Sequence, residues 1–145
     1  MLDFAAERAL ADLLVALAQQ GLVGSAHDLA DGGLAQALTE SALRYGTGAR
    51  LALTGDPFTA LFSESTARVV VTTSDPGGVE DTARWAGVPV TELGTTGGDA
   101  LVLDGLLDLP LAELRAAWSA TLPALFGGPE HSTPLTVPAG TVPTS

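Results

Sequence analysis

The stretch SAHDLADGGLAQAL, residues 25–38, constrains the fold more than any other part of the chain. It joins a short apolar segment at 22–26 to an amphipathic helical pattern at 33–45, with Gly32 and Gly33 in the first helical turn. Glycine is a poor helix former, so two together indicate that a ligand or another backbone approaches where a Cβ would collide. The sequence therefore predicts a strand, a tight junction and a helix, with something held against the glycines.

Helical and extended patterns alternate along the rest of the chain. Apolar spacing predicts further helices over 3–20, 56–62, 80–86 and 109–125. Extended segments are expected at 50–53, 68–73, 88–93 and 100–103, the last two joined by a glycine-rich hairpin at 94–99. Because a hairpin cannot belong to an all-parallel sheet, we expect an α+β (mixed α/β) fold, with helices packed on a mixed or antiparallel sheet of about four to five strands.

Composition limits the size and the partners of this fold. A chain of 145 residues is one ordinary domain, expected over 1–127. Residues 128–145 are rich in Gly, Pro, Thr and Ser without an apolar period, which predicts a disordered tail that includes His131 as a solvated side chain. The net charge of −11 disfavours nucleic acid and anionic membranes as partners.

Two further features concern chemistry and compartment. The chain has no cysteine, which excludes disulfides, thiolate catalysis and zinc–thiolate sites. The apolar run at 9–18 contains Asp12 and lacks the flanks of a signal or membrane segment. We therefore expect a soluble, cytoplasmic protein.

The junction itself offers ligand chemistry. Free N–H groups at a helix start favour an anion such as a phosphate, but Asp31 would repel a phosphate unless Mg²⁺ lay between them. One interpretation is thus a metal–phosphate site that uses His27, Asp28, Asp31 and the two glycines. The simpler alternative is that Asp31 caps the helix, the glycines allow close packing and His27 is a hydrogen-bonded turn residue. The sequence contains neither a P-loop nor a G-x-G-x-x-G pattern, so no known nucleotide-binding motif decides between the two interpretations.

A second candidate is LFSESTARVVV, residues 61–71. Glu64 and Arg68 flank Ser65 and are suited to bind a ligand's hydroxyl or phosphate; the alternative is a surface ion pair between Glu64 and Arg68. No G-x-S-x-G elbow surrounds the serines, which disfavours a serine hydrolase. If both segments serve one site, His27, Asp28 and Asp31 should converge with Glu64 and Arg68 at the carboxyl end of the first strand, where an ion pair between Asp31 and Arg68 becomes feasible. Otherwise the two segments lie on opposite faces of the sheet.

Three segments together resemble a known family: SAHDLADGGLAQALTE, DPFTALFSESTARVVV and LPLAELRAAWSATLPALFG. Their order and separation resemble the C-terminal domain of phosphoribosylformylglycinamidine synthase, over residues 1–127. The combination of HDLxDGGL with FxExxxR is rare, although Ala30 and Ser63 stand where that synthase commonly has Ser and Gly. Other superfamily members remain alternative identities: aminoimidazole ribonucleotide synthetase, selenophosphate synthetase, thiamine-monophosphate kinase and a hydrogenase maturation protein.

The resemblance implies an activity for a larger enzyme. ATP and Mg²⁺ would activate the formamide oxygen of formylglycinamide ribonucleotide, and ammonia from glutamine would displace phosphate to give the amidine, a step of purine synthesis. The chain resembles the second of two pseudo-symmetric copies; in the first copy, the segment equivalent to His27-Asp28 holds a magnesium ligand and the segment equivalent to 63–65 contacts substrate. Implied partners are the N-terminal ATP-binding domains of the same enzyme, a glutaminase subunit and a small accessory subunit.

The residues themselves limit what this chain does alone. It has no lysine and no glycine-rich nucleotide loop, so we expect no catalytic residue and no tight binding of ATP or Mg²⁺ by the isolated chain. Asp28 is the candidate metal ligand, and the candidate ligand-binding residues are His27, Asp31, Gly32, Gly33, Glu64, Ser65 and Arg68. Because the helical pattern begins directly after Met1, the chain is expected to be an excised, folded and inactive domain. A free-standing interaction module without catalysis is the alternative from a different class.

Overall fold

The computed structural model describes residues 3–126 and contains five helices and six strands in mixed order. The elements are α1 (Phe4–Gln19), β1 (Ser25–Asp28), α2 (Gly33–Tyr45), β2 (Ala49–Leu51), α3 (Pro57–Phe62), β3 (Val69–Thr72), α4 (Pro76–Ala86), β4 (Gly94–Thr96), β5 (Ala100–Leu103), β6 (Leu107–Pro110) and α5 (Leu111–Phe126). The expected α+β fold class is confirmed. The expected tail at 128–145 lies outside the described residues.

The strands divide into two sheets. The larger one has the order β4-β2-β5-β6, in which β2 and β5 are parallel and the other pairs are antiparallel. The smaller one, called here the β1–β3 ribbon, pairs β1 antiparallel to β3 with His27 opposite Val70 and Asp28 opposite Val69. The junction therefore begins in the ribbon and not in the larger sheet.

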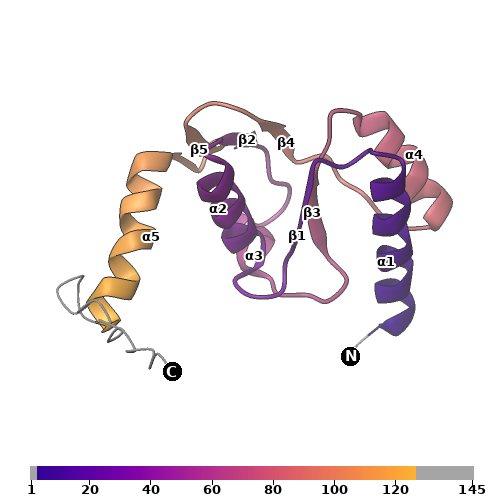
Figure 1. The fold of residues 1–145 in the computed structure, drawn as a ribbon, viewed down its shortest axis with the longest axis horizontal. Helices are drawn as coiled ribbons and strands as arrows, with labels where there is room; N and C mark the ends of the chain where they lie inside the picture. Colours follow the sequence, from indigo (N-terminus) through magenta and orange to yellow (C-terminus); the bar gives the residue numbers. More distant parts are fainter. Residues whose placement is uncertain (1–2, 127–145) are drawn as a thin grey trace, which may run out of the picture.

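The helices surround these sheets in an extended row (Figure 1). α1 and α4 lie side by side at one end, α2 and α3 lie beyond the ribbon, and α5 lies at the other end. Three clusters of buried apolar residues follow this order, one between α1 and α4, one around the start of α2, and one between α2, α5 and the larger sheet. Leucine, valine and alanine are the buried residues of these clusters.

Aspartates begin three of the helices. The side chains of Asp3, Asp56 and Asp75 accept hydrogen bonds from backbone N–H groups in the first turns of α1, α3 and α4. With Asp75 as its N-cap and Pro76 in its first turn, α4 begins at residue 76. The predicted start at residue 80 is therefore too late, because Pro76 and the two glycines after it belong to the helix. Among the described residues, no helix is both long enough and apolar enough to span a bilayer.

The predicted hairpin near the end of the chain is wrong. Residues 88–93 are not a strand; β4 lies within the expected turn and pairs with β2, while β5 forms its hairpin with β6. Asp104-Gly105 supplies the turn, since Gly105 has φ +75° and the Leu106 N–H donates to the Leu103 carbonyl at 2.9 Å. Strand β6 was not predicted, and it delays the start of the last helix to Leu111.

Candidate functional site

The two glycines of the junction are held against the end of α3. Gly32 and Gly33 have left-handed φ values of +71° and +63°. A Cβ on Gly33 would stand 2.7 Å from the Leu61 carbonyl oxygen and 3.1 Å from that of Ser63. The close approach of another backbone, one of the two predicted reasons for the glycines, is thus confirmed. The neighbour is the 61–63 segment, so both quoted motifs meet here.

The start of α2 has no side-chain cap of its own. Gly32 is the N-cap residue, and its N–H donates to Glu64 Oε1 at 2.8 Å. Asp31 is exposed and makes no hydrogen bond or ion pair with the residues that the structure describes. The interpretation of Asp31 as the cap is therefore wrong, because the left-handed turn at Gly32 puts one residue between Asp31 and the helix. The carboxylate of Glu64, 32 positions further along the chain, accepts the hydrogen bond from the Gly32 N–H instead.

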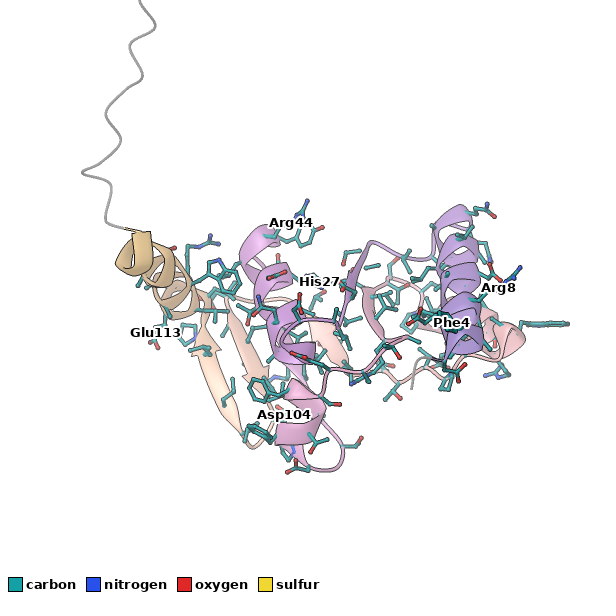
Figure 2. The ribbon with its side chains drawn as sticks, turned by 90° about the horizontal axis from the view of Figure 1, so that it is seen from below. Phe4, Arg8, His27, Arg44, Asp104 and Glu113 are labelled. Carbon is teal, nitrogen blue, oxygen red and sulfur yellow. The ribbon has the colours of Figure 1, made fainter. Side chains whose placement is uncertain are left out.

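His27 points toward α2. Its Nε2 lies 2.8 Å from Glu40 Oε2, and its Nδ1 lies 2.7 Å from the Asp28 carbonyl oxygen. Both partners only accept hydrogen bonds when Glu40 is ionised, so a protonated His27 ring, which donates from both nitrogens, satisfies both contacts. The bond to the Asp28 carbonyl, and then the bond to Glu40, raise the pKa of His27 above its usual 6.5. Figure 2 shows His27 beside α2, with Arg44 near the end of that helix and Phe4 and Arg8 of α1 well away from it.

Glu40 is fixed from two sides. Its Oε1 accepts a hydrogen bond from Gln36 Nε2 at 2.6 Å, while Oε2 accepts from His27. The bond from His27, followed by that from Gln36, lowers the pKa of Glu40 below its usual 4.5. A pocket of about 80 Å³ adjoins this pair, too small for a nucleotide, since ligand pockets measure roughly 300–1,000 Å³. The cluster thus ties β1 to α2.

Asp28 belongs to the opposite side of the ribbon. It lines an open hollow of about 490 Å³, which falls in the size range of ligand sites. The hollow, as it is called below, is lined by Glu7, Leu10, Ala11, Leu14, Asp28, Ala30, Glu64, Ser65, Thr66, Ala67 and Arg68. The predicted residues Asp28, Glu64, Ser65 and Arg68 are therefore brought together.

Arg68 has no acidic partner among the residues that the structure describes. Its Nη1 makes two long hydrogen bonds of 3.4 Å, to the Ser63 carbonyl oxygen and to Ser65 Oγ. Neither the Glu64–Arg68 ion pair nor the Asp31–Arg68 ion pair is present among the described residues, so the former alternative is wrong. Ala67 has a left-handed φ of +57°, a conformation that costs roughly 1–3 kcal/mol outside glycine. This strained residue turns the chain into β3 beside Arg68.

The expected convergence of the two segments holds only in part. Successive side chains of a strand point to opposite faces, so His27 contacts Glu40 while Asp28 lines the hollow, although His27 Nδ1 lies only 3.6 Å from Asp28 Oδ1 at the end of the strand. His27 lines the small pocket next to Glu40, and Asp31, Gly32 and Gly33 do not line the hollow. Among residues 3–126 there is no group of three or more His, Asp and Glu side chains arranged to hold a metal ion. A metal ion at Asp28 would need ligands from elsewhere.

Sequence reasoning missed two sets of residues. Gln36 and Glu40 lie four positions apart on α2, and this polar spacing was a signal that the helix presents a polar stripe to the strand before it. Leu10 and Leu14 of α1 line the hollow together with Glu7, but the sequence predicted these leucines only as part of a helical apolar pattern. α1 carries one broad apolar stripe, in which Leu13 and Leu17 are buried and Leu10 and Leu14 are half-buried.

Comparison with known proteins places this fold and site in a family. The model of the family described as AIR synthase related protein, C-terminal domain, matches residues 1–104, and the chain belongs to this family. The phosphoribosylformylglycinamidine synthase subunit PurL of Nocardioides sp. (strain ATCC BAA-499 / JS614) is 56% identical over 129 residues, covering 87% of this chain and 17% of the relative. The PurL subunit of Thermobifida fusca (strain YX) is 50% identical over 131 residues, with the same coverages of 87% and 17%. The resemblance identified in the sequence is confirmed, and the chain spans only 17% of the length of these two relatives.

Solved structures agree on the fold. The structure of PurLQS from Thermotoga maritima superposes with a TM-score of 0.71 at 24% identity, covering 79% of this chain and 22% of that one. T. maritima PurL complexed with ATP gives a TM-score of 0.69 at 23% identity, covering 78% and 22%. At this identity the likeness concerns the fold alone.

Proposed function

We propose that this chain acts as the C-terminal domain of a phosphoribosylformylglycinamidine synthase in the cytoplasm. The whole enzyme would convert formylglycinamide ribonucleotide to its amidine with ATP and ammonia from glutamine. The observation that carries the proposal is the identity of 56% with a PurL subunit over 87% of the chain. It is supported by the contact between the HDLADGGL and FSESTAR segments, since the residues that carry the family resemblance meet in space.

The residues of the hollow have separable roles in this proposal. Arg68, a cation without a carboxylate partner, is suited to an anionic group of the substrate or nucleotide, and Ser65 offers a hydroxyl beside it. Asp28, whose side chain is 75% exposed, would supply one oxygen ligand to Mg²⁺. When bound, Mg²⁺ would neutralise phosphate charge. Because one carboxylate does not hold Mg²⁺, the remaining ligands would come from the ATP-binding domain.

The other predicted residues act on the shape of the site. Gly33 lets the 61–63 segment pack on α2, and Glu64 fixes it through the Gly32 N–H. His27 joins β1 to α2 through Glu40 and so holds the strand that presents Asp28. Asp31 is free to contact a neighbouring domain. This chain would therefore position groups for a reaction whose nucleotide is bound mainly by another domain.

The names of the structural relatives support the cofactor and the partners. T. maritima PurL has been solved with ATP and with FGAR, and a PurLQS structure exists. We extend these ligands to the enzyme that contains this chain, together with a glutaminase subunit and a small accessory subunit as partners.

A chimaeric enzyme tests the proposal. The 129 matched residues of the Nocardioides PurL subunit are replaced by this chain, and amidine formation is measured with ATP, formylglycinamide ribonucleotide and ammonia. We expect turnover within about tenfold of the intact subunit, and none from this chain alone. In the chimaera, Arg68→Gln should raise the KM, while Arg84→Gln, which removes the exposed Arg84–Asp81 pair, should not. A chimaera that folds but makes no amidine would contradict the proposal.

A further inference from the structure

The wall that α1 contributes to the hollow has no role in the proposed reaction. α1 buries Leu13 and Leu17 against Val79 and Ala83 of α4. Leu10 and Leu14 form one edge of the same apolar stripe, line the hollow and are only half-buried. An amphipathic surface helix normally buries its apolar stripe against the core. The edge of the stripe at Leu10 and Leu14 is therefore open to something outside the described residues.

The ribbon opposite this wall is also incompletely covered. All four residues of β3 are only half-buried, although three of them are valines. A two-stranded sheet is marginal by itself and normally packs against further structure. Val70 faces the cluster around α2, whereas Val69 shares the other side of the ribbon with its partner Asp28, the side of the hollow. Half-buried valines therefore remain on the ribbon, although none of them lines the hollow, whose apolar lining comes from α1, Ala30 and Ala67.

Charge decides what fits between these walls. Glu7, Asp28 and Glu64 line the hollow, with Arg68 as the single basic residue among its lining residues. The chain as a whole carries a net charge of −11. A triphosphate lying along the apolar wall would meet three carboxylates, whereas an apolar side chain flanked by Lys or Arg would meet the leucines of α1 and those same carboxylates, away from Arg68.

We propose that the hollow is a docking site for a segment of the larger synthase chain. That segment inserts an apolar side chain between Leu10 and Leu14, and its flanking basic side chains pair with Glu7 and Glu64. The inference rests on the proposed function, because this chain spans only 17% of the PurL relatives and the rest of such a chain is the occupant. Docking there leaves Asp28 and Arg68 at the border between the two domains, where a shared ligand site would form.

The absence of cysteine allows a direct test. Ala11 lines the hollow and is exposed, and Ala18 is an equally exposed alanine of the same helix outside it. Ala11→Cys and Ala18→Cys are made in this chain and in the chimaera, and N-ethylmaleimide labelling rates are measured at each cysteine by mass spectrometry. We expect the chimaera to slow labelling at position 11 at least tenfold and to leave position 18 within twofold.

Charge and volume give a second readout. In the chimaera, Ala11→Arg should lower the melting temperature clearly more than Ala18→Arg, and Leu14→Glu more than Val15→Glu, whose native side chain is 55% exposed. Equal labelling at position 11 in the chain and the active chimaera would overturn the docking site and leave the proposed function standing. Slower labelling at position 11 in a chimaera that forms no amidine would support the docking site and contradict the proposed function. Protection of the isolated chain by ATP, or by raising its own concentration, would identify a nucleotide or a second copy as the occupant and overturn the inference.

Discussion

The four-stranded sheet and the β1–β3 ribbon differ in how far they bury their side chains. In the larger sheet Ala49, Leu51, Leu101 and Leu103 are at most 7% exposed. In the ribbon no side chain is fully buried: β3 is half-buried throughout, and β1 alternates between half-buried and exposed. The candidate site residues belong to the ribbon and its loops. The inner strands β2 and β5 of the larger sheet are therefore better buried than the ribbon, which leaves its side chains partly accessible to neighbours.

The largest effect is expected in the larger sheet. Leu101→Ala removes a side chain that is 5% exposed and packed in the cluster with Ala42, Ala49, Leu51 and Leu111. Such truncations leave a cavity and cost about 2–5 kcal/mol of unfolding free energy. Urea denaturation followed by circular dichroism measures the loss. Val102→Ala, on the other side of the same strand, is the control, and an equal loss in both would contradict the difference between the two faces.

The junction should come next, because it couples α2 to the loop before the ribbon. Gly33→Val places a β-branched residue at φ +63°, at a cost of roughly 1–3 kcal/mol, and drives its Cβ against the Leu61 carbonyl. Gly46→Val is the matched control, since Gly46 has the same φ of +63° with no atom within 4 Å of the added Cβ. Gly33→Val should lose more unfolding free energy than Gly46→Val. Equal losses would mean that the backbone contact has no energetic weight.

A smaller effect is expected within the ribbon. Val71→Ala removes two methyl groups from a half-buried position, worth about 1 kcal/mol or less when burial is partial. The same urea titration measures it. A loss as large as that of Leu101→Ala would show that the ribbon is as well packed as the larger sheet. The difference in burial between the two sheets, which supports the docking site, would then not hold.

The smallest effect concerns the His27–Glu40 pair and depends on pH. The raised pKa of His27 gives stability that is complete below 6.5 and lost as pH rises through its folded value; the lowered pKa of Glu40 gives stability that is present above 4.5 and lost as pH falls through its folded value. The gap in stability between the natural chain and Glu40→Gln should therefore be largest between 4.5 and 6.5 and shrink above it. Glu40 is 38% exposed, so we expect well under ~1 kcal/mol. A gap that grows above pH 7 would contradict this assignment.

Most elements of the fold were predictable because their signals are local. The helical pattern at 33–45 and its end at Gly46 were read directly from the sequence. Residues 88–93 alternate like a strand and yet form none: the Leu93 carbonyl accepts from the Ala52 N–H at 2.9 Å, but it is the next segment, β4, that pairs with β2. Gly94 allows this, since a Cβ there would collide with the Arg50 carbonyl oxygen. Such contacts between distant segments leave no local pattern.

The sequence predicted which residues of the candidate site lie near one another, but not on which face of the ribbon each side chain lies. The grouping of Asp28 with Glu64 and Arg68 followed from strand ends, whereas the position of His27 required the register of β1, where one residue changes the face of every side chain. The wall from Leu10 and Leu14 was not predicted because these leucines belong to the same apolar stripe as the buried Leu13 and Leu17.

The bond between the Gly32 N–H and Glu64 has a consequence for the order in which the chain folds. α1, α3 and α4 are capped by the aspartate directly before them, so their first turns can form from local contacts alone. The first turn of α2 instead depends on the Glu64 carboxylate, 32 residues further along the chain. The chain between Gly32 and Glu64 must close into a loop before that hydrogen bond can form. In kinetic terms, substitutions at Glu64 should accelerate unfolding and hardly change the refolding rate, whereas removing Asp56 should slow refolding if α3 belongs to the nucleus. The junction that defines the family would then be among the last parts of the chain to become native.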